Sequence, residues 1–521
     1  MKEIFGRGRV VTIKRMRMVT SNFLVAAVLS IGLVSIGTAS QAGAASGGTL
    51  NVGFTVGIPQ LNPALTTFSV EQTLFPLLWD GLTQWKSNGK IGPDLATSWT
   101  SSNGNQKWTF QLNSGVKFSN GVPVTSADVV SSFNYYLNPS TPFQDNTGLG
   151  IVKSVTASGP NSVVIQLSSP NASFPDSVTP VKVIDMAALS TIDTNPIGTG
   201  PFIVQSFVPN STLTLVRNPN YWGTKPSVSQ INITTEPDAT AAFTALTSGT
   251  LQVVGQVPDS ELTAAKSNPS LKIVQPANPG SYLTWETDTK AGPFANVKAR
   301  QALAYAINAK AVLSEAYFGA GKISTEANPL STTNPWYDGH LTKYTYDLKK
   351  AKALFAEAGV RKGTTFTWWS TSAYPEWTTA GEILQASLAK IGLKLKIVNN
   401  DVSTWAAKFY PAGKSFPGII IPNFQSVSGD PVFAFTFYAP GRCECNFNSG
   451  VIAAAYKAAV GSTSTKVQAA NWDKIQRVLN QQVPTETPLQ IPTDSIVSSS
   501  VSGIWEESGN QLHLENAVMN G

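Results

Sequence analysis

The chain of 521 residues is poor in the side chains that carry most covalent and metal chemistry. It holds two cysteines, Cys443 and Cys445, and two histidines, His340 and His513. A C-x-C pair with so few histidines is too small a ligand set for a structural zinc site. The motifs H-E-x-x-H and G-x-S-x-G are both missing. We therefore expect no metal, no cofactor and no enzymatic activity.

The sequence also lacks a convincing nucleotide-binding loop. Gly413-Lys414-Ser415 looks like the end of a P-loop, but Lys408 stands where the first glycine of that motif belongs. The G-x-G at Gly198 and Gly200 is followed by proline and has no later glycine of the dinucleotide fingerprint. We interpret Gly198 and Gly200 as part of a structural turn.

Charged residues are scarce, at 13% of the chain. The net charge of +6 comes mostly from the first 44 residues, which hold six basic residues and one acidic residue. Subtracting these from the totals of 37 and 31 leaves 31 basic and 30 acidic residues. So small an excess forms no basic stripe, and we expect no nucleic-acid partner.

The N-terminus has the order of a secretory signal peptide. Residues 1–18 are basic, Phe23–Ile36 is apolar or small throughout, and small residues follow at Ala42 and Ala44. The apolar stretch is short for a bilayer-spanning helix of about 20 residues. We predict a signal peptide over residues 1–44, cleaved after Ala42 or Ala44; a retained N-terminal anchor is the alternative. No cysteine near this site supports lipid attachment.

The segment Gly92–Leu137 predicts a hairpin followed by a helix. Asn103-Gly104 is a turn pair, and the strand after it alternates apolar and polar residues at Trp108, Phe110 and Leu112. Thr125 and Asp128 then have the T-x-x-D spacing of a capping box. This ordered string closely resembles the signature region of the family 5 solute-binding proteins, the extracytoplasmic receptors of peptide, nickel and oligosaccharide ABC importers.

Other strings support the same resemblance. They are the turns at residues 195–202 (NPIGTGPF) and 217–222 (RNPNYW), the helical run Val297–Gly321 interrupted at Asn308, and the helix that Asp347 caps and Gly359 ends. Strands at 366–369 and 393–398 flank a helix at 381–390, which predicts a parallel pair.

The resemblance implies an α/β, two-lobed periplasmic-binding-protein fold of the large, type II-like class. We expect a first lobe over residues 45–275, with an inserted subdomain at about 85–195. A second lobe is expected over 276–488, and a C-terminal return to the first lobe over 489–521.

Two positions depart from the dipeptide receptors that the chain resembles. There, an aspartate four residues before the proline of G-D-P holds the ligand ammonium; here that position is Val427. An arginine before a tyrosine holds the carboxylate; here Ala373 precedes Tyr374. An unpaired buried ligand charge costs several kcal/mol, so we expect free dipeptides to bind poorly. If the alignment of this loop with the dipeptide receptors is shifted by three residues, Asp430 instead takes the position that holds the ammonium group of the ligand.

The expected ligand-binding residues are therefore mainly aromatic and amide side chains. They are Trp369, Tyr374, Trp405, Phe424, Gln425 and Asp430. About half of these aromatics could equally be core packing, as we expect for the neighbouring Trp368. No histidine falls in the cleft segment of the second lobe, so nickel is not the expected ligand.

These observations predict a monomeric, extracytoplasmic receptor, periplasmic or secreted. It would capture an oligopeptide, oligosaccharide or other amphiphile between its lobes and deliver it to an ABC permease. The alternatives are a receptor of the same fold that feeds a sensor and, from a different class, a secreted hydrolase. Cys443 and Cys445 form either a disulfide or two free or otherwise paired thiols.

Overall fold

The computed structural model describes residues 47–65, 69–141, 149–255, 257, 259–276, 281–408, 410, 412–426, 431–439, 441–491, 494–508 and 511–520. The predicted signal peptide at residues 1–44 lies outside these ranges, as do Val427 and Asp430. None of the described helices is both long and apolar enough to cross a membrane.

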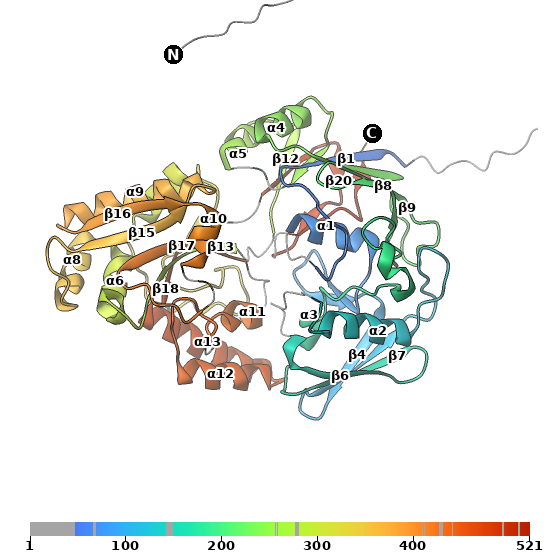
Figure 1. Ribbon diagram of the computed structural model, residues 1–521, viewed down its shortest axis with the longest axis horizontal. Helices are drawn as coiled ribbons and strands as arrows, with labels where there is room; N and C mark the ends of the chain where they lie inside the picture. The colour runs from blue at the N-terminus through green and yellow to red at the C-terminus, as the bar shows by residue number, and fades with distance from the viewer. Residues whose placement is uncertain are drawn as a thin grey trace, which may run out of the picture. The chain divides into compact units, whose positions relative to one another are not determined.

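One part of the chain, called the first lobe below, is built on a seven-stranded sheet (Figure 1). Its order is β12 (Leu271–Val274), β19 (Ser495–Ser498), β11 (Val253–Gly255), β1 (Thr49–Phe54), β10 (Gln230–Thr235), β9 (Thr212–Arg217) and β8 (Phe202–Val208). Strand β1 pairs in parallel with β10 and β11. Its Leu50, Val52 and Phe54 are buried in the core of this lobe, because alternate side chains of a strand face the same side.

The first lobe also carries a four-stranded antiparallel sheet that matches the predicted hairpins. Its order is β4 (Ala96–Ser102), β5 (Lys107–Leu112), β7 (Ser162–Leu167) and β6 (Val152–Ala157). Asn103 and Gly104 have φ of 52° and 59° in the turn between β4 and β5, as a turn pair requires. Helix α2 (Ser126–Leu137) packs on this sheet. Its capping box is present: the Thr125 N–H donates to Asp128 Oδ2 at 2.7 Å.

The other part, called the second lobe below, is built on a six-stranded sheet. Its order is β14 (Lys322–Ile323), β18 (Thr485–Gln490), β13 (Ser281–Thr287), β17 (Ile419–Ser426), β15 (Thr365–Thr371) and β16 (Lys394–Asn400). Strands β15 and β16 run parallel and α9 (Pro375–Lys390) packs on both, which confirms the predicted strand-helix-strand unit (Figure 1). The domain boundaries at 275/276 and 488/489 stay predictions.

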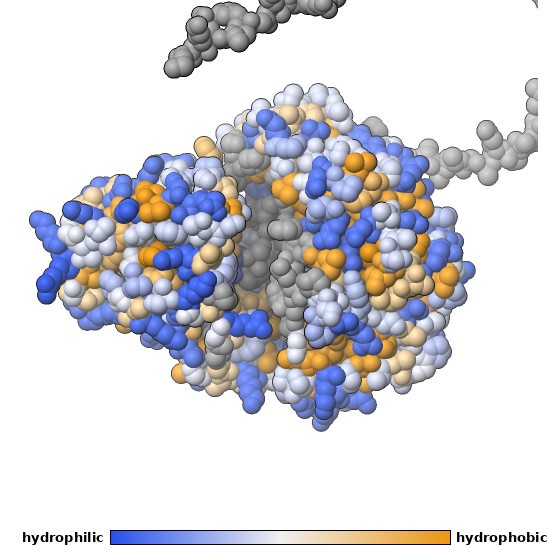
Figure 2. Space-filling model, viewed as in Figure 1, coloured by the Kyte–Doolittle hydropathy of each residue, from blue (hydrophilic) through white to orange (hydrophobic). Residues whose placement is uncertain are grey.

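Three further helices of the second lobe form a core of their own. They are α11 (Pro431–Thr436), α12 (Gly450–Val460) and α13 (Thr465–Gln482). The end of α12 touches the first lobe: the Ala172 N–H donates to the Val460 carbonyl at 2.5 Å, and Asn105 Nδ2 donates to the Gly461 carbonyl at 3.3 Å. In the view of Figure 2, the surface is hollowed between the two lobes.

Two local predictions have informative outcomes. The helical run 297–321 is more broken than expected. It forms α6 (Val297–Ala306), a single turn at Ala309–Ala311 that the Asn308 side chain caps, and a π-helical turn at Val312–Ala316. Gly198 and Gly200 form a structural turn, as predicted. A Cβ on Gly198 would lie 1.9 Å from the Leu78 carbonyl oxygen, so only glycine fits there.

Candidate functional site

The second lobe presents a cluster of aromatic rings, which we call the aromatic wall: Tyr374, Trp377, Phe424, Trp405 and Tyr410. The ring of Tyr374 lies 4.4 Å from Trp377 and 5.5 Å from Phe424, and Trp405 lies 5.3 Å from Trp377, centroid to centroid. Tyr374 follows the carboxyl end of β15, and α10 (Val402–Ala407), which carries Trp405, follows that of β16. Parallel strands bring these ends to one edge of the sheet, where α/β proteins bind ligands.

The rings of the aromatic wall differ in how far they are available to a ligand. Tyr374 is 39% exposed and Phe424 is half-buried, whereas Trp405 is 7% and Trp377 is 1% exposed. Trp377 was not predicted, and it lies at the centre because Tyr374, Phe424 and Trp405 all pack on it. Trp405 therefore supports the wall more than it presents a free face.

The other predicted residues lie elsewhere or belong to the core. Trp369 is half-buried, and the Lys408 ammonium lies 5.5 Å from its ring centroid. Trp368 is fully buried and donates its Nε1–H to the Trp377 carbonyl at 3.0 Å, as expected of core packing. The structure thus brings Tyr374, Trp405 and Phe424 together around Trp377, whereas the contact described for Trp369 is with Lys408.

A buried carboxyl group lies behind Gln425, and sequence reasoning missed it. Glu286 on β13 is fully buried, and its Oε1 accepts a hydrogen bond from Asn423 Nδ2 at 3.1 Å. Burial, with the nearby Glu444 charge, raises the pKa of Glu286 to about 8, although hydrogen bonds from Asn423 and Gln425 oppose the shift. Glu286 is therefore mostly uncharged at neutral pH. A lone glutamate inside an apolar strand sequence was its only signal.

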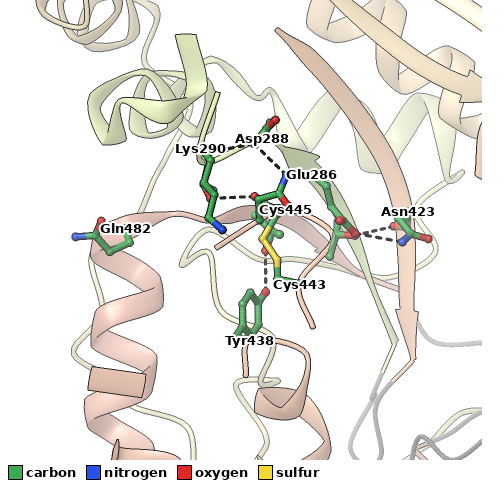
Figure 3. The surroundings of a disulfide bond; sticks show 12 residues. Glu286, Asp288, Lys290, Asn423, Tyr438, Cys443, Cys445 and Gln482 are labelled. Atoms are coloured by element: carbon green, nitrogen blue, oxygen red, sulfur yellow. Dashed lines mark hydrogen bonds between the residues drawn. A yellow bond between two sulfur atoms is a disulfide. The ribbon is translucent and has the colours of Figure 1, made fainter. Parts of the chain in front are cut away.

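Cys443 and Cys445 form a disulfide, which decides between the two predicted states (Figure 3). Both cysteines are buried. The Cys445 carbonyl accepts the Thr289 N–H at 2.9 Å, and Asn446 Nδ2 donates to Asp288 Oδ1 at 3.1 Å, so the loop is fixed beside the end of β13. Glu444, between the two cysteines, is thereby held where its charge acts on Glu286.

The first lobe contains a cavity of about 110 Å³, which sequence reasoning also missed. We call it the first-lobe cavity. Its apolar lining includes Phe75, Trp79, Trp85 and Pro180, and its polar lining includes Gln72, Asp80, Gln84, Asp94, Thr179, Lys182, Tyr221, Glu507, Gln511, His513 and Glu515. These residues come from α1 (Ser69–Leu78) and the segment after it, from residues 179–182, from Tyr221 and from the C-terminal tail, so no local motif announces them.

The carboxylates of this cavity are hydrogen-bonded. Asp80 Oδ2 accepts the Trp222 Nε1–H at 2.8 Å, and Asp94 Oδ2 accepts the Gly81 N–H at 2.8 Å. Burial raises the pKa of both Asp80 and Asp94. Each side chain thus takes up a proton more readily than an exposed aspartate.

His513 joins the remaining two carboxylates of the first-lobe cavity. Its Nδ1 lies 3.0 Å from Glu515 Oε1 and its Nε2 lies 3.2 Å from Glu507 Oε2. Burial alone would lower the pKa of His513, but the two glutamates outweigh burial and raise it to about 9. The imidazolium also stacks on Trp505, with 3.8 Å between ring centroids.

A second cavity, of about 270 Å³, lies between the lobes. We call it the interlobe crevice. Trp85, Lys90 and Asp176 of the first lobe face it, together with Trp336 and Trp472 of the second. Trp85 lines both this crevice and the first-lobe cavity. Within the described ranges, no group of three or more His, Cys, Asp or Glu side chains is arranged so that it could hold a metal ion.

Known proteins of similar sequence and structure agree with this architecture. The chain is 28% identical to heme-binding protein A of Haemophilus influenzae over 77% of this chain and 79% of that protein. It is 28% identical to the dipeptide-binding protein of Escherichia coli over 72% and 74%. The structure of the periplasmic binding protein DppA of Helicobacter pylori with the peptide STSA matches 91% of this chain and 98% of its own, with a TM-score of 0.78 at 22% identity.

The family comparison covers most of the chain. The family model for bacterial extracellular solute-binding proteins, family 5 Middle, matches residues 90–442. This range includes the hairpin-helix segment that carried the resemblance in sequence, the interlobe contacts of Asn105 and Ala172, and the aromatic wall. The chain belongs to family 5 of the bacterial extracellular solute-binding proteins.

Proposed function

We propose that the protein captures a peptide or similar solute between its two lobes and delivers it to the permease of an ABC importer. The interlobe crevice carries this proposal, because residues of both lobes line it. A ligand that touches both lobes favours the closed arrangement over the open one. Relatives named for dipeptide, di/tripeptide and heme binding support a receptor of small solutes.

The proposed cycle is binding and release, so the protein needs no catalytic group. The two histidines support this proposal. His513 is enclosed by two glutamates, and the exposed His340 contacts Asp338 at 3.1 Å. Neither histidine is hydrogen-bonded to a serine or cysteine within the described part of the chain. We expect the purified protein to bind its ligand without altering it.

The proposed receptor works outside the cytoplasm as a monomer. The basic and apolar stretches of residues 1–36 motivate export. N-terminal sequencing of the secreted protein should begin at Gly43 or Ala45. A mature protein that keeps Phe23–Ile36 in the membrane would contradict the cleavage.

We further propose that Trp369, Tyr374, Trp405, Phe424, Gln425 and Asp430 contact the ligand. Tyr374 and Phe424 are the strongest of these, because both rings are partly exposed beside each other. Aromatic faces with amide neighbours suit capped or longer peptides, oligosaccharides or other amphiphiles. With Val427 and Ala373 at the anchor positions, zwitterionic dipeptides should show no measurable heat of binding at millimolar concentration.

Thermal unfolding of the mature protein tests this function. A ligand present at about 100 times its dissociation constant adds roughly 2.7 kcal/mol of stability, so a cognate peptide or oligosaccharide should raise the Tm visibly. If broad panels of both classes leave the Tm unchanged while nickel raises it, the proposed ligand class is wrong. Clear dipeptide binding that Asp430→Asn abolishes would show that the anchor alignment is shifted by three residues.

A further inference from the structure

Lys182 is held rigidly at the wall of the first-lobe cavity. Its backbone forms an antiparallel bridge with Gly81, and its N–H donates to Tyr136 Oη at 3.3 Å. The next residue, Val183, donates its N–H to the Asp80 carbonyl at 3.0 Å. The residue is only 7% exposed and lines the cavity. The fold therefore fixes a buried lysine next to Asp80.

The ammonium group of Lys182 has no partner of its own in the described part of the chain. It makes no hydrogen bond there, and no carboxylate oxygen of a described residue lies within 4.0 Å of Nζ. Its charge nevertheless opposes the rise that burial causes in the pKa of Asp80 and Asp94, and it adds to the effect of His513 in lowering the pKa of Glu515, so the ammonium lies among these groups without touching them. A lysine ammonium has three donors, and Lys182 contributes them to the lining of the first-lobe cavity.

Unlike the Lys182 ammonium, the carboxyl groups around it have hydrogen-bond partners within the protein. Asp80 accepts from Trp222, Asp94 accepts from Gly81 and Gln84, and Glu507 and Glu515 both accept from His513. Each acidic side chain of the lining therefore has a hydrogen-bond donor already. Among the described residues, the Lys182 ammonium and Glu515 Oε2 of the lining are left without a hydrogen-bond partner, so the lysine can still bind an acceptor on a ligand.

We propose that Lys182 is the anion anchor of the ligand site, and that it binds a carboxylate of the transported solute inside the first-lobe cavity. This inference rests on the proposed receptor function and narrows it to solutes that carry a carboxylate. Lys182 would supply in the first lobe the positive charge that Ala373 does not supply in the second. A carboxylate would accept charge-assisted hydrogen bonds from the ammonium, and Gln84, Gln511 and Tyr221 also line its surroundings.

The same lining restricts the rest of the solute. Four carboxyl groups against two cations disfavour a ligand with several negative charges. The position of the ammonium-binding aspartate of the dipeptide receptors is Val427 in this chain, whereas Glu515 Oε2 is buried without a hydrogen-bond partner in the described ranges and can accept a hydrogen bond from a donor on the ligand. The favoured solute has one carboxylate, such as an N-acylated peptide or a sugar acid.

Matched pairs of probes test the anchor by calorimetry and thermal shift. One pair is an N-acetylated tripeptide with a free carboxylate and the same peptide as its carboxamide. The other pair is a disaccharide that ends in a uronic acid and its neutral counterpart. The wild type should prefer the acid of at least one pair by about ten- to a hundredfold, the range of a hydrogen bond to a charged group.

Three variants assign that preference to the lysine. Lys182→Met keeps the length of the side chain and should remove the preference for the acid. Lys182→Arg keeps the charge and should retain most of it. Lys153→Met, which changes an exposed lysine on β6, should behave as the wild type. Circular dichroism and the Tm of each variant establish that it is folded. If Lys182→Met does not fold, the preference for the acid over its neutral counterpart is compared between the wild type and Lys182→Arg on both probe pairs.

The outcomes separate the anchor from the proposed peptide ligand. If only the sugar acid binds and Lys182→Met loses it, the anchor stands and the peptide proposal falls. If neutral peptides or sugars bind as well as their acids, or Lys182→Met keeps the preference, the receptor function stands and the anchor is overturned. If no acid of either pair binds the wild type, the anchor is overturned as well.

Discussion

The aromatic wall and the first-lobe cavity offer a ligand different kinds of contact. The wall is built from rings 4.4 to 6.2 Å apart, and the carboxyl group behind it, Glu286, is mostly uncharged at neutral pH. The cavity collects four carboxyl groups, a lysine and a histidine around about 110 Å³. Rings tolerate many apolar and sugar faces, whereas fixed charges accept few partners. In the proposed ligand site, the second lobe therefore contributes contact area and the first lobe contributes selectivity.

The prediction with the largest expected effect is that Trp377, the buried centre of the aromatic wall, contributes more to stability than the exposed Tyr374. Trp377→Ala should lower the free energy of unfolding by about 3 to 5 kcal/mol, since a fully buried tryptophan leaves a cavity. Tyr374→Ala, at the exposed rim, should cost about 1 kcal/mol or less. Urea unfolding of both variants checks this contrast. Equal losses would mean that rim and centre are one packed unit.

The second prediction concerns pH and the uncharged state of Glu286. Its folded-state pKa of about 8 lies above the ordinary value of 4.5. The folded protein therefore keeps this proton longer than the unfolded chain does. The resulting contribution to stability is fully present below pH 4.5 and is lost as the pH rises through about 8, with a slope approaching roughly 1.4 kcal/mol per pH unit.

Glu286→Gln should remove that part of the pH dependence, because the amide does not titrate. The difference in unfolding free energy between variant and wild type should grow in favour of the variant from pH 5 to pH 8. Glu382→Gln, which changes an exposed carboxyl group on α9, is the control. His513 titrates in both proteins and cancels in the difference. Parallel pH profiles of Glu286→Gln and the wild type would show that Glu286 is already ionised at pH 5.

The third prediction tests whether the aromatic wall contacts the ligand. Trp405→Ala should weaken the true ligand by about 1 to 3 kcal/mol, as the loss of a buried aromatic anchor does. Because Trp405 packs on Trp377, we also expect a lower Tm. Tyr374→Ala should weaken binding by a similar amount with little change in Tm. Unchanged affinity in both variants, measured by calorimetry, would remove the wall from the ligand site.

The smallest expected effect lies outside both regions. Thr125→Ala removes the N-cap side chain of α2 and should cost about 1 kcal/mol of stability, with ligand affinity unchanged. Chemical unfolding and calorimetry on the same preparation check this. A clear loss of affinity would mean that the four-stranded sheet and α2 help to shape the ligand site.

Local rules explain which parts of the structure were predictable. The turn at Asn103-Gly104, the cap at Thr125 and the parallel pair β15–β16 follow from residues close in sequence, and all are present. The Tyr374–Phe424 contact was within reach because both residues were expected to bind the ligand in the second lobe. Predictions that depend on Val427 and Asp430 stay predictions, since both lie outside the described residues.

The first-lobe cavity could not be predicted because its parts are far apart in the sequence. Asp80, Lys182 and His513 meet only when three distant segments fold together. No periodicity or spacing links such residues. The disulfide was undecidable for a different reason. Two cysteines two residues apart require a backbone with suitable Cα separation, here 5.1 Å, which the sequence alone does not reveal.

The position of β19 has a consequence for the biosynthesis of the protein. This strand, Ser495–Ser498, lies between β11 and β12 in the seven-stranded sheet, and the first strand of that sheet begins at Thr49. The sheet that begins at Thr49 is thus completed only by a strand that starts at Ser495. Such non-local pairing makes folding slow. This sheet consequently cannot be complete before β19 has been synthesised, and an incompletely folded polypeptide can still be threaded through a narrow channel.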